Sequence, residues 1–145
     1  MTNDQLIQVF VYGTLKPGES NYSFYCEGKI IAEIPAYTWG QLYHFSVGYP
    51  GMTQGNHKVR GWLLSFKDQQ ILASLDALED YQEHRLPELN EYNRRQVPIY
   101  SLAGDSLGNA WCYVMSLAKV REKKGILVTD SQWNSKFWLN IDKGR

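Results

Sequence analysis

The chain has 145 residues, 43% of them hydrophobic, which is the size of one ordinary domain that buries a core without disulfides or metals. Fifteen basic and fifteen acidic side chains cancel and are interspersed, which argues against a nucleic-acid or membrane-surface binder. The two cysteines, Cys26 and Cys112, lie far apart with no ligand-type spacing, which argues against a disulfide framework or a structural zinc site.

We therefore expect a single domain over residues 1–145 with two reduced core thiols. The N-terminus, residues 1–5, lacks a basic region followed by an apolar run, and no apolar stretch approaches the roughly 20 residues needed to span a bilayer. These features predict a cytoplasmic protein whose partner is a small molecule or another protein, with no nucleic-acid or membrane partner.

The first predicted strand covers residues 6–12, which are bulky, aromatic or β-branched on both alternating faces, as in a strand covered on both sides. Gly13 ends this run, and we expect it to adopt backbone conformations closed to other residues. Its missing side chain would let a small anion or carbonyl oxygen approach the amides of Thr14 and Leu15. An ordinary strand-to-loop turn is the alternative, and the local pattern by itself favours that alternative.

After this loop, Ser20 or Asn21 is expected to cap a short helical turn that Gly28 ends. Extended segments and turns follow: strands at 29–36, 37–45 and 57–66, and turns at 47–51 and 54–56. Pro35 confines pairing near the first junction to an edge or bulge, so we expect a bent or broken strand and then a hairpin.

The clearest helix is predicted from Gln69 to Tyr81, with Asp68 as its N-cap. Its apolar face consists of Ile71, Leu72, Leu75 and Leu78. At about 100° per residue, Glu79 falls about 80° from Ile71, inside this face, so its carboxylate should point inward. Asp76 and Asp80 fall at the edge or on the solvent side, where we expect them to serve solubility.

The C-terminal half predicts a loop, a hairpin, a basic turn and a tail. These are the loop 87–90, strands 91–100 and 111–115 around a turn at 104–109, the basic patch 119–124, and an aromatic tail with Trp133, Phe137 and Trp138. We expect Pro98 to limit pairing of its strand, the basic patch to be solvated, and the tail, within residues 119–145, to dock on the body. Short strands with one good helix and no strict βαβ alternation predict an α+β domain built on an antiparallel-rich sheet or small barrel.

A carboxylate among leucines is hard to ionise, so burial should raise the pKa of Glu79 toward the range useful for a general base. The alternative is that the helix end frays and Glu79 reaches water, Arg85 or Arg94, and the pattern alone leaves both open. The histidines, at positions 44, 57 and 84, share no spacing typical of a metal site, and we expect them on the surface or in strands.

Two motifs resemble the gamma-glutamylcyclotransferase family, including its AIG2-like and small bacterial branches. The first is Tyr12-Gly13-Thr14-Leu15-Lys16, followed by Gly18 and Asn21-Tyr22, which resembles the family's opening motif. The second is Leu75-Asp76-Ala77-Leu78-Glu79, where the family has a Leu-Asp pair, two variable residues and the glutamate that accepts a proton. Weaker matches are residues 59–63, 92–94 and 111–114, so the likeness runs from about Val9 to Met115 and leaves the tail unmatched.

The resemblance implies a small mixed β-barrel, antiparallel-rich, with flanking helices and a pocket open at one end. It implies an enzyme that cyclises a gamma-glutamyl amine or peptide to 5-oxoproline without metal or cofactor, with Glu79 as general acid/base. The substrate-binding residues that it implies are Tyr12, Gly13, Thr14, Leu15 and Tyr113, with Lys16, Asn21, Tyr92 and Arg94 as looser candidates.

Other interpretations remain open at this stage. A protein of the same fold can bind a small molecule or regulate without turning anything over, since a fold can outlive its chemistry. An interaction module that uses the aromatic tail is a further alternative. Variable loops are expected to bind the leaving group, and the candidates are residues 49–56 and 83–90; the motifs do not specify which gamma-glutamyl compound is used.

Overall fold

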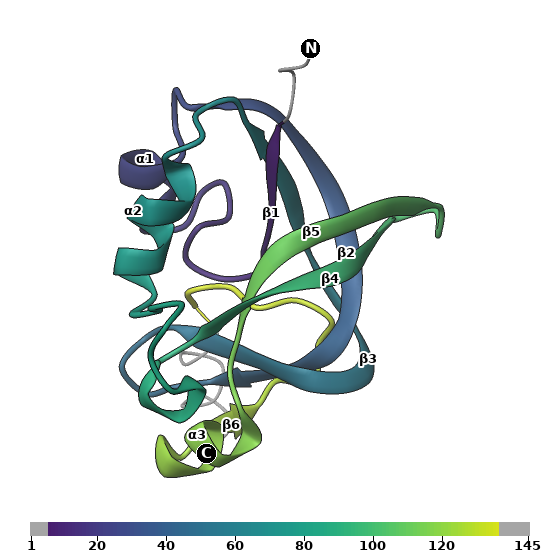
Figure 1. Ribbon diagram of the computed structural model, residues 1–145. Coiled ribbons are helices and arrows are strands. Elements are labelled where there is room, and N and C mark those ends of the chain that lie inside the picture. Colours follow the sequence, from purple (N-terminus) through teal and green to yellow (C-terminus); the bar gives the residue numbers. More distant parts are fainter. Residues whose placement is uncertain (1–5, 137–145) are drawn as a thin grey trace.

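The computed structural model describes residues 6–136, and its strands form one mixed sheet that closes into a small barrel (Figure 1). The strands are β1 (Ile7–Val11), β2 (Ile30–His44), β3 (Pro50–Phe66), β4 (Asn93–Ser101), β5 (Ser106–Val114) and β6 (Ile126–Leu127). They are ordered β3-β1-β5-β4-β2-β6, and an additional pairing of β3 with β2 closes the barrel. Only the β1–β5 pairing is parallel among these strands. The predicted α+β class and antiparallel-rich mixed barrel are confirmed.

The helices flank this barrel at two places. They are α1 (Tyr22–Tyr25), α2 (Ile71–Leu78), α3 (Leu117–Glu122) and a single 3₁₀ turn (Pro87–Leu89). In Figure 1, α1 and α2 lie together on one side of the barrel, while α3 and β6 lie at its lower end. No helix within residues 6–136 is long and apolar enough to cross a membrane.

The strand β1 is central, as its sequence predicted. It pairs antiparallel with β3 along its whole length and parallel with β5 at Val9. Val9 and Val11 face one buried cluster, which also contains Leu75 of α2, whereas Phe10 faces a second cluster that contains Trp133. Both faces of β1 are therefore covered, which explains why the strand is apolar at consecutive positions.

The hairpin of β2 and β3 is longer than the sequence predicted. The strand β2 runs without a break through Pro35, and the turn falls before Pro50, with Gly48 N–H donating to the Phe45 carbonyl (2.9 Å). The expected turn at 54–56 is wrong, because these residues lie inside β3 as a bulge between the pairs Gly40–His57 and Gln41–Thr53. A Cβ on Gly55 would lie 2.9 Å from the backbone of Gly40, so the glycines there permit close approach of two strands.

The hairpin of β4 and β5 also differs at its turn. The strand β5 begins at Ser106, so the predicted turn at 104–109 lies too far along the chain, and Gly104 N–H donates to the Ser101 carbonyl (2.8 Å) to close the actual turn. Pro98 pairs with Asn109 next to a register irregularity, as expected for a proline in a strand.

The helix α2 is shorter than predicted at both ends, although Asp68 Oδ1 accepts a hydrogen bond from Gln70 N–H (2.9 Å). At the C-terminus, Asp80 adopts a left-handed conformation (φ 56°), and Tyr81 N–H donates to the Asp76 carbonyl (2.9 Å). This is the Schellman arrangement that closes a helix end. It leaves Glu79 as the C-cap residue, directly after the helix.

One prediction for the C-terminal region needs revision. The basic patch 119–124 is not a turn, because most of it belongs to α3, whose N-cap Ser116 accepts a hydrogen bond from Lys119 N–H (3.1 Å). Within the patch, Arg121 and Lys124 are exposed, whereas Lys119 and Lys123 are half-buried. Trp133, in the predicted tail, is fully buried against the barrel, and its Nε1–H donates to Nδ1 of His44 (3.0 Å), which is the buried last residue of β2. Phe137 and Trp138 lie outside the described residues.

Candidate active site

A cavity of about 470 Å³ opens between the end of β1, the β2–β3 turn, the end of α2 and the start of β4. Its wall contains residues 10–15, 20–21, 47–50, 78–80 and 91–92, together with Tyr113. Glu79 and the predicted substrate-binding residues, Tyr12, Gly13, Thr14, Leu15 and Tyr113, all line it. Segments that are far apart in sequence thus meet around one space, which is of the size that holds a small molecule.

Gly13 is required at the cavity for a reason other than the predicted one. Its φ is not positive, and the left-handed residue of this loop is Gly18 (φ 90°). A Cβ on Gly13 would lie 2.7 Å from Cγ and 3.0 Å from Cδ of Pro50. The space that the missing side chain leaves is therefore filled by the Pro50 ring rather than left open for a ligand.

The opening loop is held by hydrogen bonds that use its carbonyls. Lys16 N–H donates to the Gly13 carbonyl (3.0 Å), and Asn21 N–H donates to the Thr14 carbonyl (2.8 Å). The side chain of Asn21 also donates to Thr14 Oγ1 (2.9 Å). In the part of the chain that the structure describes, the N–H groups of Thr14 and Leu15 donate to no protein acceptor. The loop thus has fixed carbonyls and two unused donors beside the cavity.

Lys16, a looser candidate, does not line the cavity. Its side chain is buried and its Nζ donates to the carbonyl of Trp133, which ties the opening loop to the C-terminal segment. Burial lowers the pKa of its ammonium group. Lys16 therefore supports the loop from behind.

Glu79 lines the cavity from the end of α2, where its N–H donates to the Leu75 carbonyl (2.9 Å). Burial raises the pKa of its carboxyl group to about 8, and the negative charge of Glu91 adds to the effect. The arginines that might have neutralised it bind elsewhere: Arg85 pairs with Asp80 (3.0 Å) and Arg94 with Asp76 (2.9 Å). Of the two alternatives that the sequence left open, the structure favours the inward-facing side chain: Glu79 is half-buried in the cavity wall, and neither arginine pairs with it.

The tyrosines of the wall have their hydroxyl groups engaged by the protein. The hydroxyl of Tyr12 donates to the Tyr113 carbonyl (2.6 Å) and accepts from Met52 N–H (3.1 Å), while that of Tyr92 donates to the Pro50 carbonyl (2.6 Å). Burial raises the pKa of Tyr12, of Tyr92 and of Tyr113, so these three tyrosines stay neutral. Their rings shape the cavity, and their hydroxyls hold neighbouring strands together.

The helical wheel suggested that Asp76 serves solubility, and this prediction is wrong. Its carboxylate accepts hydrogen bonds from Arg94 Nη1 (2.9 Å) and from the hydroxyl of Tyr113 (2.7 Å). The side chains of Arg94 and Asp76 are 13% and 23% exposed, so the pair is largely buried. The one feature of the sequence that could have indicated this role is that Asp76 belongs to the Leu-Asp pair of the second motif. Asp80 is exposed, as expected, but pairs with Arg85.

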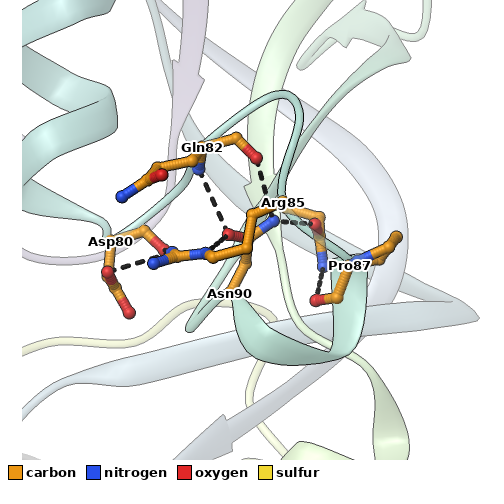
Figure 2. Close-up of polar contacts among 6 residues, drawn as sticks. Asp80, Gln82, Arg85, Pro87 and Asn90 are labelled. Carbon is orange, nitrogen blue, oxygen red and sulfur yellow. Dashed lines mark hydrogen bonds and ion pairs between the residues drawn. The ribbon is translucent and has the colours of Figure 1, made fainter.

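The loop that connects α2 to β4 is held by a polar network that the sequence analysis missed (Figure 2). Asn90 is 2% exposed, and its Oδ1 accepts from Gln82 N–H (3.1 Å) and from Arg85 Nε (2.6 Å). Its Nδ2 donates to Asn93 Oδ1 (2.9 Å). No local pattern marks Asn90, because loop residues of this type are mostly exposed.

A second set of missed residues lies at the cavity wall and behind it. Glu91 Oε2 accepts from the Tyr49 hydroxyl (2.7 Å) and pairs with Lys123 Nζ (2.7 Å). Tyr49 belongs to one of the loops predicted for the leaving group, and Lys123 to the patch predicted to be solvated. Pro50 of the same loop also lines the cavity, whereas residues 52–56 and 87–88 line a second cavity of about 1270 Å³ and residues 83–86 line neither.

Residues 6–136 contain no group of three or more His, Cys, Asp or Glu side chains arranged to hold a metal ion. Both cysteines are free and buried, as the sequence predicted. Burial raises the pKa of the Cys26 thiol to about 11, so it stays protonated.

Comparison with known proteins gives consistent matches. Residues 9–135 match the family model described as gamma-glutamyl cyclotransferase, AIG2-like. A Vibrio cholerae protein named "Putative gamma-glutamylcyclotransferase" is 32% identical over 106 residues, which are 73% of this chain and 79% of that one. The gamma-L-glutamyl-butirosin B gamma-glutamyl cyclotransferase of Niallia circulans is 31% identical over 109 residues, covering 73% of this chain and 65% of that one.

Solved structures show the same fold. The crystal structure of an AIG2-like protein from Mus musculus superposes with a TM-score of 0.69 at 23% identity, covering 89% of this chain and 88% of that one. A solution structure from Arabidopsis thaliana gives a TM-score of 0.62 at 20% identity, covering 97% and 85%. The matched residues of the family model extend past Met115, where the sequence motifs end, into the segment that contains α3 and Trp133.

Proposed function

The chain belongs to the AIG2-like gamma-glutamyl cyclotransferase family and is an enzyme of that type, and on this premise we propose that it cyclises a gamma-glutamyl amine or peptide to 5-oxoproline. The reaction takes place in the 470 Å³ cavity, with Glu79 as general acid and base. One observation carries the proposal: the half-buried carboxyl group of Glu79, with a pKa raised to about 8, lines the same cavity as the opening loop.

The chemistry is an intramolecular aminolysis. Glu79 takes a proton from the α-ammonium group of the substrate, and the freed amine attacks the side-chain amide carbon to form a five-membered lactam. The bond from that carbon to the leaving nitrogen breaks, and Glu79 returns its proton to this nitrogen. The second proton that the attacking nitrogen loses is taken up by the released amine, which leaves as an ammonium ion. A pKa of about 8 suits both steps, because the group is a stronger base than an ordinary carboxylate and still ionises near neutral pH.

The opening loop is proposed to bind the glutamyl end of the substrate. Its backbone from Tyr12 to Leu15 lines the cavity, and the N–H groups of Thr14 and Leu15 have no protein acceptor in the described chain. These two N–H groups donate hydrogen bonds to the substrate carbonyl oxygen that gains negative charge during attack. Because Asn21 holds the loop at Thr14, these donors are in place before the substrate arrives, and such preorganised dipoles favour the transition state.

Tyr12 and Tyr113 are proposed to contact the substrate with their rings. Their hydroxyls are engaged by Tyr113 O and by Asp76, and burial keeps both phenols neutral. They therefore define the shape of the cavity, and proton transfer is left to Glu79.

The test is release of 5-oxoproline, measured by mass spectrometry, from a panel of gamma-glutamyl amines, dipeptides and gamma-glutamylated amino sugars. The last class is included because the relative from Niallia circulans is named for gamma-L-glutamyl-butirosin B. An N-acetylated version of each substrate is the chemical control, since a blocked α-amine cannot attack.

Glu79→Gln should abolish release while the protein stays folded. Glu83→Gln is the matched variant, because Glu83 is exposed and does not line the cavity, and its activity should equal that of the wild type. Full activity of Glu79→Gln would remove this residue from its proposed role. Binding of the panel without any 5-oxoproline would instead favour a non-catalytic binding or regulatory protein of the same fold.

A further inference from the structure

Glu91 is the centre of a polar cluster built from three separate parts of the chain. Its Oε2 accepts from the hydroxyl of Tyr49, in the β2–β3 turn, at 2.7 Å, and from Nζ of Lys123, at the end of α3, at 2.7 Å. Lys123 Nζ also donates to the hydroxyl of Tyr49 (3.0 Å). The side chains of Lys123 and Glu91 are 24% and 25% exposed, so the pair is shielded from solvent over most of its surface.

This cluster is tied to Glu79 through the backbone. Glu91 N–H donates to the carbonyl of Asp80 (3.2 Å), the residue that follows Glu79. Both Glu79 and Glu91 line the cavity. The hydrogen bond therefore fixes the spacing between the two glutamates, and Asn90, next to Glu91, holds the same loop in place.

The other titratable or charged groups around Glu79 are neutral or already paired. They are Tyr12 at the end of β1, Tyr92 before β4, Cys112 and Tyr113 on β5, and Asp76 and Asp80 on or next to α2. Burial raises the pKa of these tyrosines and of the Cys112 thiol, which keeps them uncharged. The two aspartates are paired with Arg94 and Arg85. Glu91 is thus the acid whose charge is exerted across the cavity.

We propose that Glu91 and Lys123 are positioning residues for the proposed reaction, with Glu91 setting a negative charge against Glu79 and Lys123 and Tyr49 partly neutralising it. The cluster fixes the pH at which Glu79 gives up its proton, because a nearby like charge disfavours ionisation and a nearby cation favours it. The role of Glu79 in this inference rests on the proposed function.

The test is the pH dependence of kcat/KM between pH 5 and 10 for variants on each side of the pair. Glu91→Gln removes the like charge and should move the acid limb to lower pH, whereas Lys123→Met exposes that charge and should move the limb to higher pH. One unit charge screened by solvent on the far side of a cavity should shift the midpoint of the acid limb by on the order of half a pH unit. Lys123→Arg keeps the positive charge and should give the same pH profile as the wild type.

Arg121→Met is the matched control, because it removes one positive charge from an exposed position of the same helix. Its profile should coincide with that of the wild type. If the cluster had only a structural role, Glu91→Gln and Lys123→Met would both lower activity without moving the acid limbs of their pH profiles in opposite directions. That result would overturn the proposal. If Lys123→Met does not fold, Tyr49→Phe removes one of the two hydrogen bonds to Glu91 and should give a smaller upward shift.

A readout without turnover separates this inference from the proposed function. The ¹³C carboxyl resonance of Glu79, identified by its loss in Glu79→Gln, should titrate with midpoints displaced downward in Glu91→Gln and upward in Lys123→Met. An inactive wild type with these displacements would refute the cyclisation and retain the electrostatic coupling. Unchanged midpoints would overturn the coupling even if the wild type released 5-oxoproline.

Discussion

Gly13 and Pro50 are packed so closely that a Cβ on Gly13 would lie 2.7 Å from Cγ of the proline ring. The contact joins the opening loop to the start of β3, and both residues line the cavity. A proline ring has little freedom to move aside, so the backbone of the loop would have to shift to accept a methyl group.

Gly13→Ala is therefore expected to destabilise the protein by about 1–3 kcal/mol, the usual effect of overpacking, and to lower kcat/KM at least about tenfold by displacing the loop. Pro50→Ala added to this variant removes Cγ and Cδ and should recover most of both losses. Urea unfolding and kcat/KM of the two single variants and the double variant measure the coupling. Additive effects of the two substitutions would show that the contact does not explain the glycine.

Glu79 should make the stability of the protein depend on pH. Its pKa is raised from 4.5 in an ordinary carboxyl group to about 8, so between these values the folded state keeps a proton that the unfolded chain has lost. Stability from this group is full below about pH 4.5 and declines as the pH rises through about 8. Glu79→Gln cannot ionise, and at pH 9 it should be more stable than the wild type by on the order of 3 kcal/mol.

Thermal unfolding of the wild type and Glu79→Gln at pH 5 and pH 9 tests this expectation. The two proteins should unfold at similar temperatures at pH 5 and diverge at pH 9, with the variant melting higher. Glu83→Gln, at an exposed position, should follow the wild type at both pH values. A wild type that gains stability over Glu79→Gln as the pH rises would mean that the Glu79 carboxylate is well solvated.

Asp76 and Asp80 should differ sharply when each is replaced by alanine. Asp76→Ala leaves Arg94, 13% exposed, without its counter-ion and the Tyr113 hydroxyl without its acceptor, and should cost about 3 kcal/mol of unfolding free energy. Asp80→Ala breaks a pair whose acid is 58% exposed and places alanine at a left-handed position, which together should cost about 1 kcal/mol. Urea denaturation of both variants gives the comparison, and equal losses would contradict the buried role of Asp76.

Removing the side chain of Asn90 should destabilise the protein, whereas removing that of its partner Gln82 should not, because Gln82 binds Asn90 through its main chain. Asn90→Ala leaves the N–H of Gln82 without an acceptor and frees the side chain of Arg85, with an expected loss of about 2 kcal/mol (Figure 2). Gln82→Ala keeps the main-chain groups that Asn90 binds, so its stability should change by less than about 0.5 kcal/mol.

Hydrogen exchange gives a local readout of the same network. In Asn90→Ala, the amides of Gln82 and Glu91 should exchange faster than in the wild type, because the loop that holds them opens more often. Amides of β1 should keep their protection. Unchanged exchange at Glu91 would show that the loop is held by other contacts.

The sequence by itself determined the elements whose patterns are local. The apolar run of β1 predicted a central strand, and the wheel of α2 put Glu79 on the buried face, because side-chain direction follows from residue spacing within one element. The motifs around Gly13 and Glu79 identified the family, and with it the mixed barrel. Even there, the physical reason for Gly13 was wrong, since the contact with Pro50 is not local.

Only the tertiary structure decided which side chains pair and where strands end. Residues 54–56 have turn-forming side chains, yet they lie within β3, because pairing with β2 overrides local preference. Lys123 and Tyr49 meet across 74 positions, and Arg94 reaches Asp76 across 18. Such pairs depend on how distant elements pack, and no spacing within a single element encodes that. The charge that surrounds Glu79, and so the pH at which it ionises, is fixed by the folded barrel.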